Sequence, residues 1–455
     1  MSSWRSRLEV SLSFLLLSSC LCWGNAAITL DGSDYTEDPP SFGHNILHQE
    51  FLLNYTSFNH GSYGACPKSV LEYQNTLRLQ QEQQPDPWMR EMYLQLINET
   101  RQEMSAYVHA EHADNLVLVE SASTAVNAIM RSFQWQPGDI VLYFSVTYKM
   151  VQNTAHWLQR QEGIEIVEVP ISFPIHEDDA LTAFTGPLQD MLQQLKYTSK
   201  IGKLRLVVLD HIVSIPAVRV PVAECAEMVK NFQKDAFVLV DGAHAIGQIH
   251  NLNLSELGPI DAYLSNGHKW LYSPKGSAFL WIHPAKVTDI FPEPTVIASS
   301  NQIGETCVSE RFAYVSTRDY TAILSMKRAL EFRQWIGGDD AIYAYNRNLA
   351  RTARSYLMNL WDVPAMAPGS LEEFMINIAL PLTDAATAKG LHAYLLSDHN
   401  MYFVIAFDTG SSYFYTRLSA QIYLEMSDFV RLGDAVLEYI TNVEKTTPRM
   451  ASLGL

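Results

Sequence analysis

The chain has 455 residues, of which 47% are hydrophobic and 18% are charged, and its formal net charge is −17. These values are typical of a globular protein large enough for one large and one smaller domain, and they exclude wholesale disorder. The acidic balance argues against nonspecific nucleic-acid binding, because a phosphate backbone repels such a surface.

Residues 1–27 are predicted to be a signal peptide. Arg5 and Arg7 precede a mostly apolar run, and the small residues after that run offer a cleavage site. The run is short for a membrane span, which needs about 20 apolar residues, and an uncleaved anchor is the alternative. We therefore expect entry into the secretory pathway and no membrane contact once the signal is removed. Three acceptor sequons agree with that route and predict glycosylation of Asn54, Asn98 and Asn253.

The cysteines indicate neither a metal site nor a disulfide framework. Two of the five lie in the signal, and Cys66, Cys225 and Cys307 show no CxxC spacing. One disulfide among these three is compatible with the sequence, but its pairing does not follow from the spacing. Cys225 lies in a helical pattern and is predicted to be part of the core.

Residues 28–64 are predicted to form an N-terminal segment, which begins as a polar, exposed arm over 28–49. The segment ends in Asn59-His60-Gly61-Ser62-Tyr63-Gly64, where the glycines permit tight turns. Helices are then predicted from Pro67 to about Gln84 and from Trp88 to about Ala110.

The next part of the chain alternates strand and helix patterns. Strands are predicted at 116–119, 140–144, 164–169, 204–209, 237–240, 261–265 and 277–282, and helices at 124–133, 150–161, 187–196 and 222–233. Such alternation predicts a mostly parallel sheet with helices on both faces, which binds ligands beyond the C-terminal strand ends.

A long helical pattern begins near Thr317 and runs through Trp335 to a break at Gly337-Gly338. Another helix is predicted from Asp339 to about Leu360, followed by helix, strand and helix patterns at 384–397, 402–407 and 427–443. We therefore expect a large domain over 65–335 and a small C-terminal domain over 336–455, which the N-terminal segment joins.

Two strand ends in the stretch 236–282 carry a candidate acid and a candidate amine. The strand that ends at Val240 is followed by Asp241, and the next strand is followed by Asn266-Gly267-His268-Lys269. Pyridoxal phosphate needs such a pair, because a lysine forms its Schiff base and a buried aspartate keeps its pyridine nitrogen protonated. Taken alone, such a pair is far more often two surface residues on ordinary loops.

The wording D-G-A-H-A…N-G-H-K-W-L…P-K-G resembles class V of the fold-type I pyridoxal-phosphate enzymes, the aminotransferase and cysteine desulfurase superfamily. Within that class the likeness is to the isopenicillin N epimerase-like branch, which also holds cysteine desulfhydrases and hercynylcysteine sulfoxide lyases. The resemblance implies an α/β fold with a mostly parallel seven-stranded sheet in the large domain and a small α+β C-terminal domain. It also implies bound pyridoxal 5'-phosphate and a homodimer.

The resemblance assigns roles to individual residues. Ser123 and Thr124 lie at a helix start whose free N–H groups bind phosphate, although helix capping explains both residues equally well. Tyr148 would stack on the cofactor ring and take part in proton transfer. The implied cofactor contacts are Ser123, Thr124, Tyr148, Ser214, Asp241, His244, His268, Lys269 and Thr317, and the implied substrate contacts are Asn59, His60 and Arg417.

Two of these assignments carry further expectations. In the family, a threonine at the place of Thr317 reaches the phosphate of the neighbouring subunit, but Ser316 replaces the usual glycine before it. Arg417 begins the wording R-L-S-A-Q-I-Y, which resembles the family's carboxylate-binding segment. Arginine suits this role because its planar fork matches a carboxylate.

The resemblance specifies the cofactor better than the reaction. Lys269 can remove the α-proton of a bound amino acid and leave a carbanion. Reprotonation then gives racemisation, proton transfer to the cofactor gives transamination, and loss of a β-sulfur group gives lysis. Because no cysteine follows Cys307, a persulfide-forming desulfurase is not expected. We expect a C–S lyase acting on cysteine or an S-substituted cysteine, with Lys269 and Tyr148 as catalytic residues; an amino-acid epimerase or an aminotransferase is the alternative.

Overall fold

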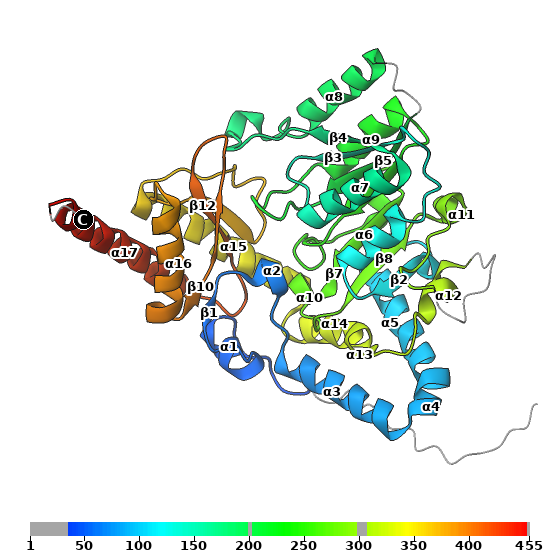
Figure 1. The fold of residues 1–455 in the computed structure, drawn as a ribbon. Helices are drawn as coiled ribbons and strands as arrows, with labels where there is room; N and C mark the ends of the chain where they lie inside the picture. The colour runs from blue at the N-terminus through cyan, green and yellow to red at the C-terminus, as the bar shows by residue number, and fades with distance from the viewer. Residues whose placement is uncertain (1–34, 199–202, 298–306, 453–455) are drawn as a thin grey trace, which may run out of the picture. The chain divides into compact units, whose positions relative to one another are not determined.

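The computed structural model describes residues 35–198, 203–297 and 307–452, and the predicted signal peptide lies outside them (Figure 1). Residues 39–455 form one unit, and residues 1–38 form another, of which only 35–38 are described. Among the described residues, no helix combines the length and the apolar character that crossing a bilayer requires.

A seven-stranded sheet with the order β2-β8-β7-β6-β5-β3-β4 organises the larger unit. Of these strands, β8 alone runs in the opposite direction to the other six. The strands are β2 (Leu116–Val119), β3 (Ile140–Phe144), β4 (Glu165–Val169), β5 (Leu204–Asp210), β6 (Phe237–Asp241), β7 (Ala262–Asn266) and β8 (Ala278–Ile282). The predicted α/β class and mostly parallel seven-stranded sheet are thereby confirmed.

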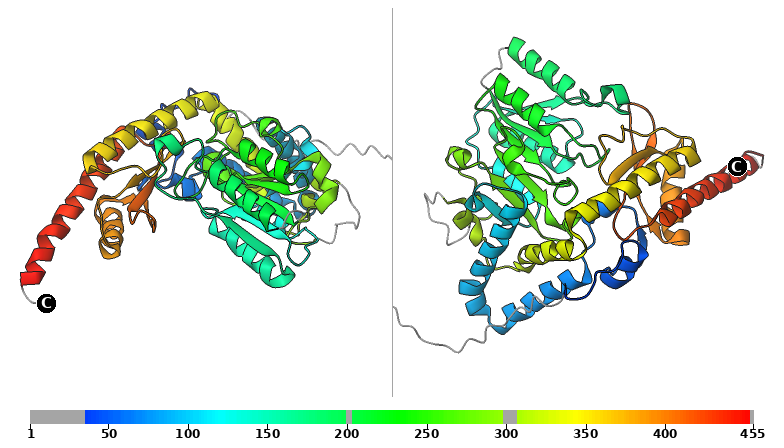
Figure 2. Two further views of the ribbon diagram at one scale, coloured as in Figure 1. Left: turned by 90° about the horizontal axis from the view of Figure 1, so that it is seen from above. Right: turned by 180° about the vertical axis from the view of Figure 1, so that it is seen from behind.

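Helices cover both faces of this sheet (Figure 2). Along β2, Leu116 and Leu118 belong to one buried cluster, whereas Val117 and Val119 belong to another. The first cluster includes α8 (Thr185–Tyr197) and α9 (Val222–Phe232), and the second includes α6 (Ala122–Met130) and α7 (Lys149–Glu162). Because both faces are buried, the strands are continuous apolar runs. Cys225 of α9 is fully buried, as predicted.

A second, antiparallel sheet lies in the C-terminal part and has the order β11-β12-β9. Its strands are β9 (Met375–Ala379), β11 (Val404–Phe407) and β12 (Phe414–Ser419), and it packs with α15 (Gly338–Trp361) and α16 (Ala385–His399). The strand predicted over 402–407 is confirmed at Val404–Phe407 as β11, but Tyr402 belongs to the separate strand β10 (Met401–Tyr402), which pairs in parallel with β1 (Thr56–Ser57). The division into a large and a small domain stays a prediction.

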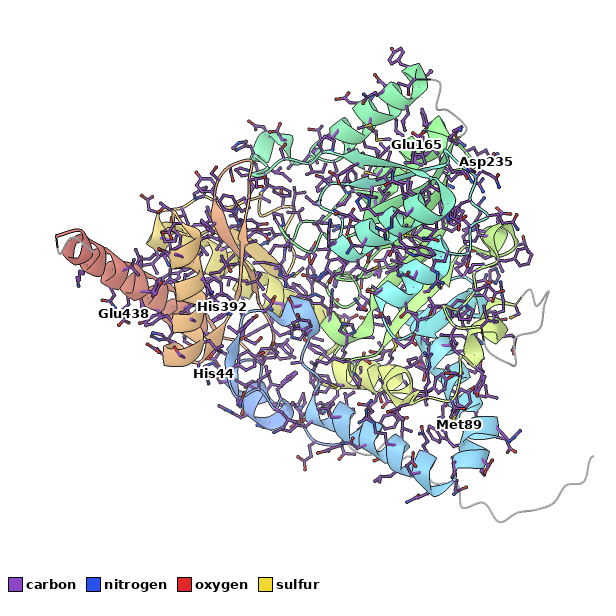
Figure 3. All side chains as sticks on the ribbon, in the orientation of Figure 1. His44, Met89, Glu165, Asp235, His392 and Glu438 are labelled. Carbon is purple, nitrogen blue, oxygen red and sulfur yellow. The ribbon has the colours of Figure 1, made fainter. Side chains whose placement is uncertain are left out.

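The described part of the arm predicted over 28–49 is mostly exposed or partly buried, as expected, but it also contains the helix α1 (His44–Glu50), which was not predicted. Gly43 precedes this helix with a positive φ of 99°, and its N–H donates to the Ile422 carbonyl at 2.7 Å. His44 Nε2 lies 2.9 Å from Asp428 Oδ2 in α17 (Met426–Ser452), close to the C-terminal elements (Figure 3). The start of α1 is therefore held by contacts with the C-terminal part of the same unit.

The remaining helical segments lie between these elements. They are α2 (His60–Tyr63), α3 (Lys68–Gln83), α4 (Pro85–Pro87), η2 (Trp88–Met92), α5 (Tyr93–Tyr107), η3 (Ala113–Asn115), η4 (Glu177–Asp179), η5 (Leu254–Glu256), α10 (Gly267–Trp270), η6 (Pro284–Lys286), α11 (Val287–Ile290), α12 (Val308–Ala313), α13 (Thr321–Leu324) and α14 (Met326–Trp335). The helix expected to begin near Thr317 starts only at Thr321, because the Asp319 carboxylate accepts the Thr321 N–H at 2.8 Å and ends the preceding loop.

Candidate active site

Several of the predicted site residues lie where parallel strands of the large sheet end. β5 ends at Asp210, β6 at Asp241 and β7 at Asn266. These strands are hydrogen-bonded neighbours that run in the same direction, so their ends share one edge of the sheet. The helical turn α10 follows β7 at once and carries Lys269. The fold therefore brings Asp241 and Lys269 together at neighbouring strand ends.

Lys269 has the properties of a reactive amine. Its Nζ atom lies 3.0 Å from His244 Nε2. The pKa of Lys269 is lowered to about 7, chiefly by burial and also by the Arg417 cation, whereas the Asp241 carboxylate acts in the opposite direction. Burial also holds the pKa of His244 well below its usual value. A large fraction of the Lys269 amine is therefore uncharged at neutral pH, as a nucleophile or base requires.

The turn that carries Lys269 is clamped by the N-terminal segment. His60 Nε2 lies 2.6 Å from the Lys269 carbonyl oxygen, and His60 Nδ1 lies 2.9 Å from the Tyr423 hydroxyl. Gly64 has φ +68°, and a Cβ atom there would collide with the His268 carbonyl. Both ring nitrogens of His60 are thus engaged within the protein. His60 therefore supports the lysine turn in this structure, and its predicted substrate contact stays a prediction.

The acid at the end of β6 is buried beside a second acid. Asp241 is 3% exposed, and its Oδ1 atom accepts the Ala243 N–H at 2.9 Å. Burial raises the pKa of Asp241, while the Ala243 amide and the Lys269 charge lower it. Asp210 is its register partner on β5 and is also 3% exposed. Sequence reasoning missed Asp210, although it follows an apolar strand in the same way.

Arg417 reaches the same region from the second sheet. Its side chain is 3% exposed and lies on the central strand β12. The Nη1 atom donates to the Ser214 carbonyl at 2.7 Å, and Nη2 donates to Asn59 Oδ1 at 2.7 Å and to Ser62 Oγ at 2.6 Å. Burial lowers the pKa of Arg417 to about 10. Arg417 is therefore in direct contact with two other predicted residues, Asn59 and Ser214.

Three buried nitrogen atoms around this cluster have no hydrogen-bond partner within the described part of the chain. They are His244 Nδ1, His268 Nδ1 and Arg417 Nε. Buried polar atoms are nearly always paired in folded proteins. These atoms therefore mark a place that suits a ligand with several charged or polar groups.

The start of α6 lies at the same edge of the sheet. Ser121 caps this helix by accepting the Thr124 N–H at 3.1 Å. Neither Ser123 nor Thr124 is the N-cap residue, so the alternative that helix capping explains these two residues is wrong. Asn266 Oδ1 accepts the Ala122 N–H at 2.9 Å and thereby ties α6 to the strand end that precedes α10. A helix start of this kind favours an anion.

Tyr148 and Thr317 are less enclosed than the other predicted residues. Tyr148 is the N-cap residue of α7 and is 51% exposed. Thr317 is exposed, and its Oγ1 atom lies 3.0 Å from the Tyr314 hydroxyl. Ser316, before it, has a φ of 101°. No contact in the described residues joins Thr317 to the Lys269 cluster.

The sequons differ in their surroundings. Asn54 and Asn98 are exposed, whereas Asn253 is partly buried and accepts the Ser255 N–H at 3.1 Å. Cys66, Cys225 and Cys307 form no disulfide in the described structure.

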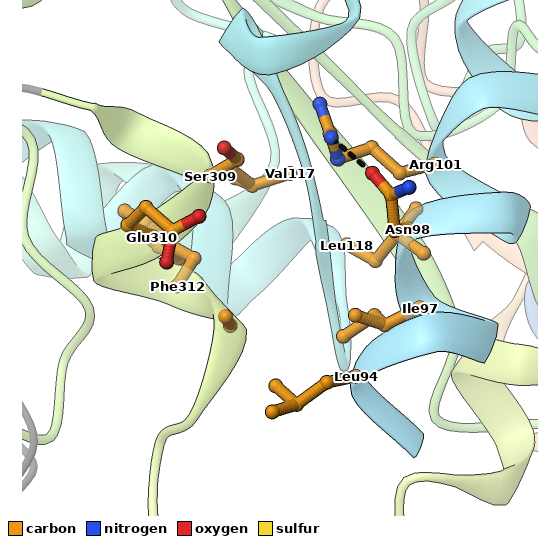
Figure 4. Close-up of a pocket in the computed structure, with 10 residues that line it drawn as sticks. Leu94, Ile97, Asn98, Arg101, Val117, Leu118, Ser309, Glu310 and Phe312 are labelled. Carbon is orange, nitrogen blue, oxygen red and sulfur yellow. Dashed lines mark hydrogen bonds between the residues drawn. The ribbon is translucent and has the colours of Figure 1, made fainter. Parts of the chain in front are cut away.

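A separate pocket of about 240 Å³ lies between α5, β2 and α12 (Figure 4). The apolar side chains of Ile97 and Phe312 line part of this pocket. Arg101 is the cation of this pocket, and it donates to Asn98 Oδ1 at 2.5 Å and to Asp114 Oδ1 at 2.8 Å. The guanidinium of Arg101 is already engaged by these partners, and none of the predicted catalytic residues lines the pocket. This pocket is therefore not the candidate active site.

Comparison with known proteins reveals relatives along most of the chain. The family profile described as Aminotransferase class-V matches residues 79–393. An L-cysteine desulfhydrase of Arabidopsis thaliana is 26% identical over 407 residues, which cover 84% of this chain and 87% of that protein. The hercynylcysteine sulfoxide lyase of Schizosaccharomyces pombe is 25% identical over 406 residues, which cover 88% of this chain and 98% of that protein. The solved structure of a C-DES mutant with glycine covalently linked to its PLP cofactor has a similar fold, with a TM-score of 0.69 and 20% identity over 86% of this chain and 98% of that one.

Proposed function

Because the chain belongs to the class V aminotransferase family, we propose that it is a pyridoxal-phosphate enzyme that cleaves the C–S bond of cysteine or of an S-substituted cysteine. The observation that carries this proposal is the buried Lys269 amine, whose pKa is about 7 and which is influenced by Asp241 and Arg417. The relatives named L-cysteine desulfhydrase and hercynylcysteine sulfoxide lyase support sulfur lysis over the other reactions of the family.

The residues at the strand ends fit this cofactor. Asp241 offers a buried carboxylate for the pyridine nitrogen, and the start of α6 offers N–H groups for the phosphate. The unpartnered nitrogens of His244 and His268 suit the ring hydroxyl and the phosphate. Once bound, pyridoxal phosphate supplies an electron sink for the charge that forms at the substrate α-carbon. The residues proposed to hold it are Ser123, Thr124, Tyr148, Ser214, Asp241, His244, His268 and Lys269.

Arg417 is proposed to bind the substrate carboxylate. Its guanidinium is fixed on two sides by Asn59, Ser62 and the Ser214 carbonyl, and its buried Nε remains without a partner. A guanidinium that is already fixed in this way binds a carboxylate with little further loss of side-chain entropy. Asn59 then acts through Arg417, and the substrate α-carbon is oriented by the position of its own carboxylate.

Lys269 and Tyr148 are proposed to move the protons. Lys269 Nζ takes the α-proton, since much of this amine is uncharged at neutral pH. The C–S bond then breaks, and its electron pair leaves with the sulfur. The Tyr148 hydroxyl, half exposed at the start of α7, donates a proton to the leaving sulfur. His60 keeps the backbone of Lys269 in place throughout.

A homodimer is the proposed assembly. Thr317 is exposed and lies outside the Lys269 cluster, as expected if it serves the phosphate of a partner subunit. Ser316 adopts a φ of 101°, a backbone region that usually favours glycine, which is the residue common in the family. Sedimentation of the purified protein tests this assembly, and a monomer that retains full activity contradicts it.

Entry into the secretory pathway and N-glycosylation are also proposed. Asn54 and Asn98 are exposed and open to modification. Thr100 of the Asn98 sequon is 2% exposed, so modification there would have to precede folding of α5. The mass of the protein from its native source, before and after removal of N-glycans, tests this. An unchanged mass together with a retained residue 1 contradicts the proposal.

A product assay tests the reaction. The protein is loaded with pyridoxal phosphate and mixed with cysteine or an S-substituted cysteine, with Lys269→Ala as the control. A C–S lyase releases pyruvate, ammonia and the sulfur product in equal amounts. Exchange of the α-hydrogen for deuterium without pyruvate indicates an epimerase instead, and amino transfer to a 2-oxo acid indicates an aminotransferase. Either outcome contradicts the proposed lysis.

A further inference from the structure

Asp210 has no part in the function described so far, although it lies next to the proposed centre. It ends β5 in register with Asp241 at the end of β6. Both residues are 3% exposed. Two buried acids on paired positions of adjacent strands disfavour each other's charge, so a purely structural need does not explain why both are present.

The contacts of Asp210 lead to the turn before α7. Thr147 Oγ1, itself buried, donates to Asp210 Oδ2 at 2.5 Å. The backbone amide of Tyr148 also hydrogen-bonds to the Asp210 carboxyl group. Tyr148 is thus held through its own backbone and through its neighbour, while its ring is 51% exposed. The Tyr148 ring is therefore accessible to a ligand, while the backbone that carries it is held in place.

The charge of the pair also suits a supporting role for Asp210. Burial and the neighbouring Asp241 together raise the pKa of Asp210 to about 8. Asp210 is therefore mostly a neutral acid at pH 7, and its carbonyl oxygen still accepts hydrogen bonds. Asp241 is then left as the one carboxylate of the pair, and it is the member that interacts with Lys269.

We propose that Asp210 is a positioning residue that holds the Thr147–Tyr148 turn, so that the Tyr148 ring covers the cofactor beside Asp241. This role rests on the proposed function, because Tyr148 is the ring that meets pyridoxal phosphate there. Asp210 itself touches neither cofactor nor substrate. Its effect on cofactor binding passes through Tyr148.

A double-mutant cycle on cofactor affinity tests this role. The dissociation constant of pyridoxal phosphate is measured by equilibrium dialysis for the full-length protein and for Tyr148→Ala, Asp210→Ala and the double variant. Loss of an aromatic stacking partner weakens binding by about tenfold. We expect Asp210→Ala to weaken it several-fold, and the double variant to bind no more weakly than Tyr148→Ala alone.

Variants of Thr147 keep the test valid if Asp210→Ala does not fold. Thr147→Val removes one hydroxyl at nearly constant volume and should reproduce the loss. Thr147→Ser and Asp210→Asn keep the hydrogen bond and should restore both the affinity and the circular dichroism of the bound-cofactor band. The positioning role of Asp210 is overturned if the losses of affinity in the two single variants multiply in the double variant. It is also overturned if Thr147→Val binds pyridoxal phosphate as tightly as the wild type; neither result affects the proposed function. If the wild-type protein binds no pyridoxal phosphate, the proposed function is contradicted as well.

Discussion

The Nζ atom of Lys269 lies 3.0 Å from the Nε2 atom of His244, and burial lowers the pKa of both side chains. A buried amine beside a neutral imidazole is an available base near neutral pH. The same amine is influenced by Arg417 and Asp241, which act on its charge in opposite directions. The reactivity of Lys269 therefore depends on residues from both sheets.

Substitution of the two charged neighbours should shift the pKa of Lys269 in opposite directions. Arg417→Gln removes a repelling cation and should raise it above the present value of about 7, whereas Asp241→Asn removes an attracting anion and should lower it. The rate of modification by acetic anhydride, followed on the Lys269 peptide by mass spectrometry, reports the uncharged amine. The exposed Lys149 serves as the internal reference. Shifts in the same direction in both variants contradict this electrostatic account.

Arg417→Lys should weaken substrate binding without loss of the cofactor. Lysine keeps the positive charge but cannot reproduce the three hydrogen bonds to Ser214, Asn59 and Ser62 that orient the fork. We expect KM for the amino acid to rise by roughly tenfold or more, at nearly unchanged pyridoxal-phosphate content. Steady-state kinetics and the absorbance of the bound cofactor measure the two effects. An unchanged KM would remove Arg417 from the substrate site.

The stability of the protein should depend on pH through His60. Burial lowers the pKa of His60 to about 3 from the ordinary value of 6.5, so below pH 6.5 the unfolded chain binds a proton that the folded protein does not take. Stability therefore falls as the pH drops from 6.5 towards 3. Over the first unit of this window the loss due to His60 is about 1 kcal/mol.

His60→Asn isolates this contribution. The variant should be less stable than the wild type near neutral pH, because the link between Tyr423 and the Lys269 carbonyl is lost. Its stability should nevertheless decline less steeply on acidification. Urea unfolding at two pH values on either side of 6.5 measures the difference. Parallel decline in both proteins would refute a buried neutral His60.

Gly64→Ala should disturb the lysine turn. The positive φ of Gly64 disfavours alanine, and the added Cβ would collide with the His268 carbonyl. We expect a loss of more than about 2 kcal/mol in stability and slower uptake of pyridoxal phosphate. Gly186→Ala is the matched control, because no heavy atom lies within 4 Å of its Cβ position and it belongs to α8. Equal effects of the two substitutions on thermal unfolding would contradict the proposed close packing.

The large sheet and its acid–amine pair could be predicted because they depend on local patterns. Runs of buried apolar residues specify the strands, and residues that follow parallel strands share one edge. Asp241 and Lys269 are found by this rule. Asp210 follows its strand in the same way, but its importance emerges only from the register with Asp241 and from the contact with Thr147.

The partners of Arg417 and His60 could not be predicted from local patterns. β12 carries Thr416, Arg417 and Ser419, which are buried polar residues and break the apolar signature of a strand. The two partners of His60 are 209 and 363 residues away in the sequence. Cofactor roles for individual residues came from family resemblance rather than from periodicity. Contacts over such separations depend on the tertiary fold.

The attachment site of the cofactor tests the central claim most directly. Wild-type protein, Lys269→Ala and Lys275→Arg are each incubated with pyridoxal phosphate and reduced with borohydride, and the modified peptide is identified by mass spectrometry. Lys275 is the matched control because it is exposed and lies six residues further along the chain. The wild type and Lys275→Arg should carry one phosphopyridoxyl group on Lys269, and Lys269→Ala should carry none. Stoichiometric labelling of another lysine, or a bound-cofactor band that persists in Lys269→Ala, would contradict the account.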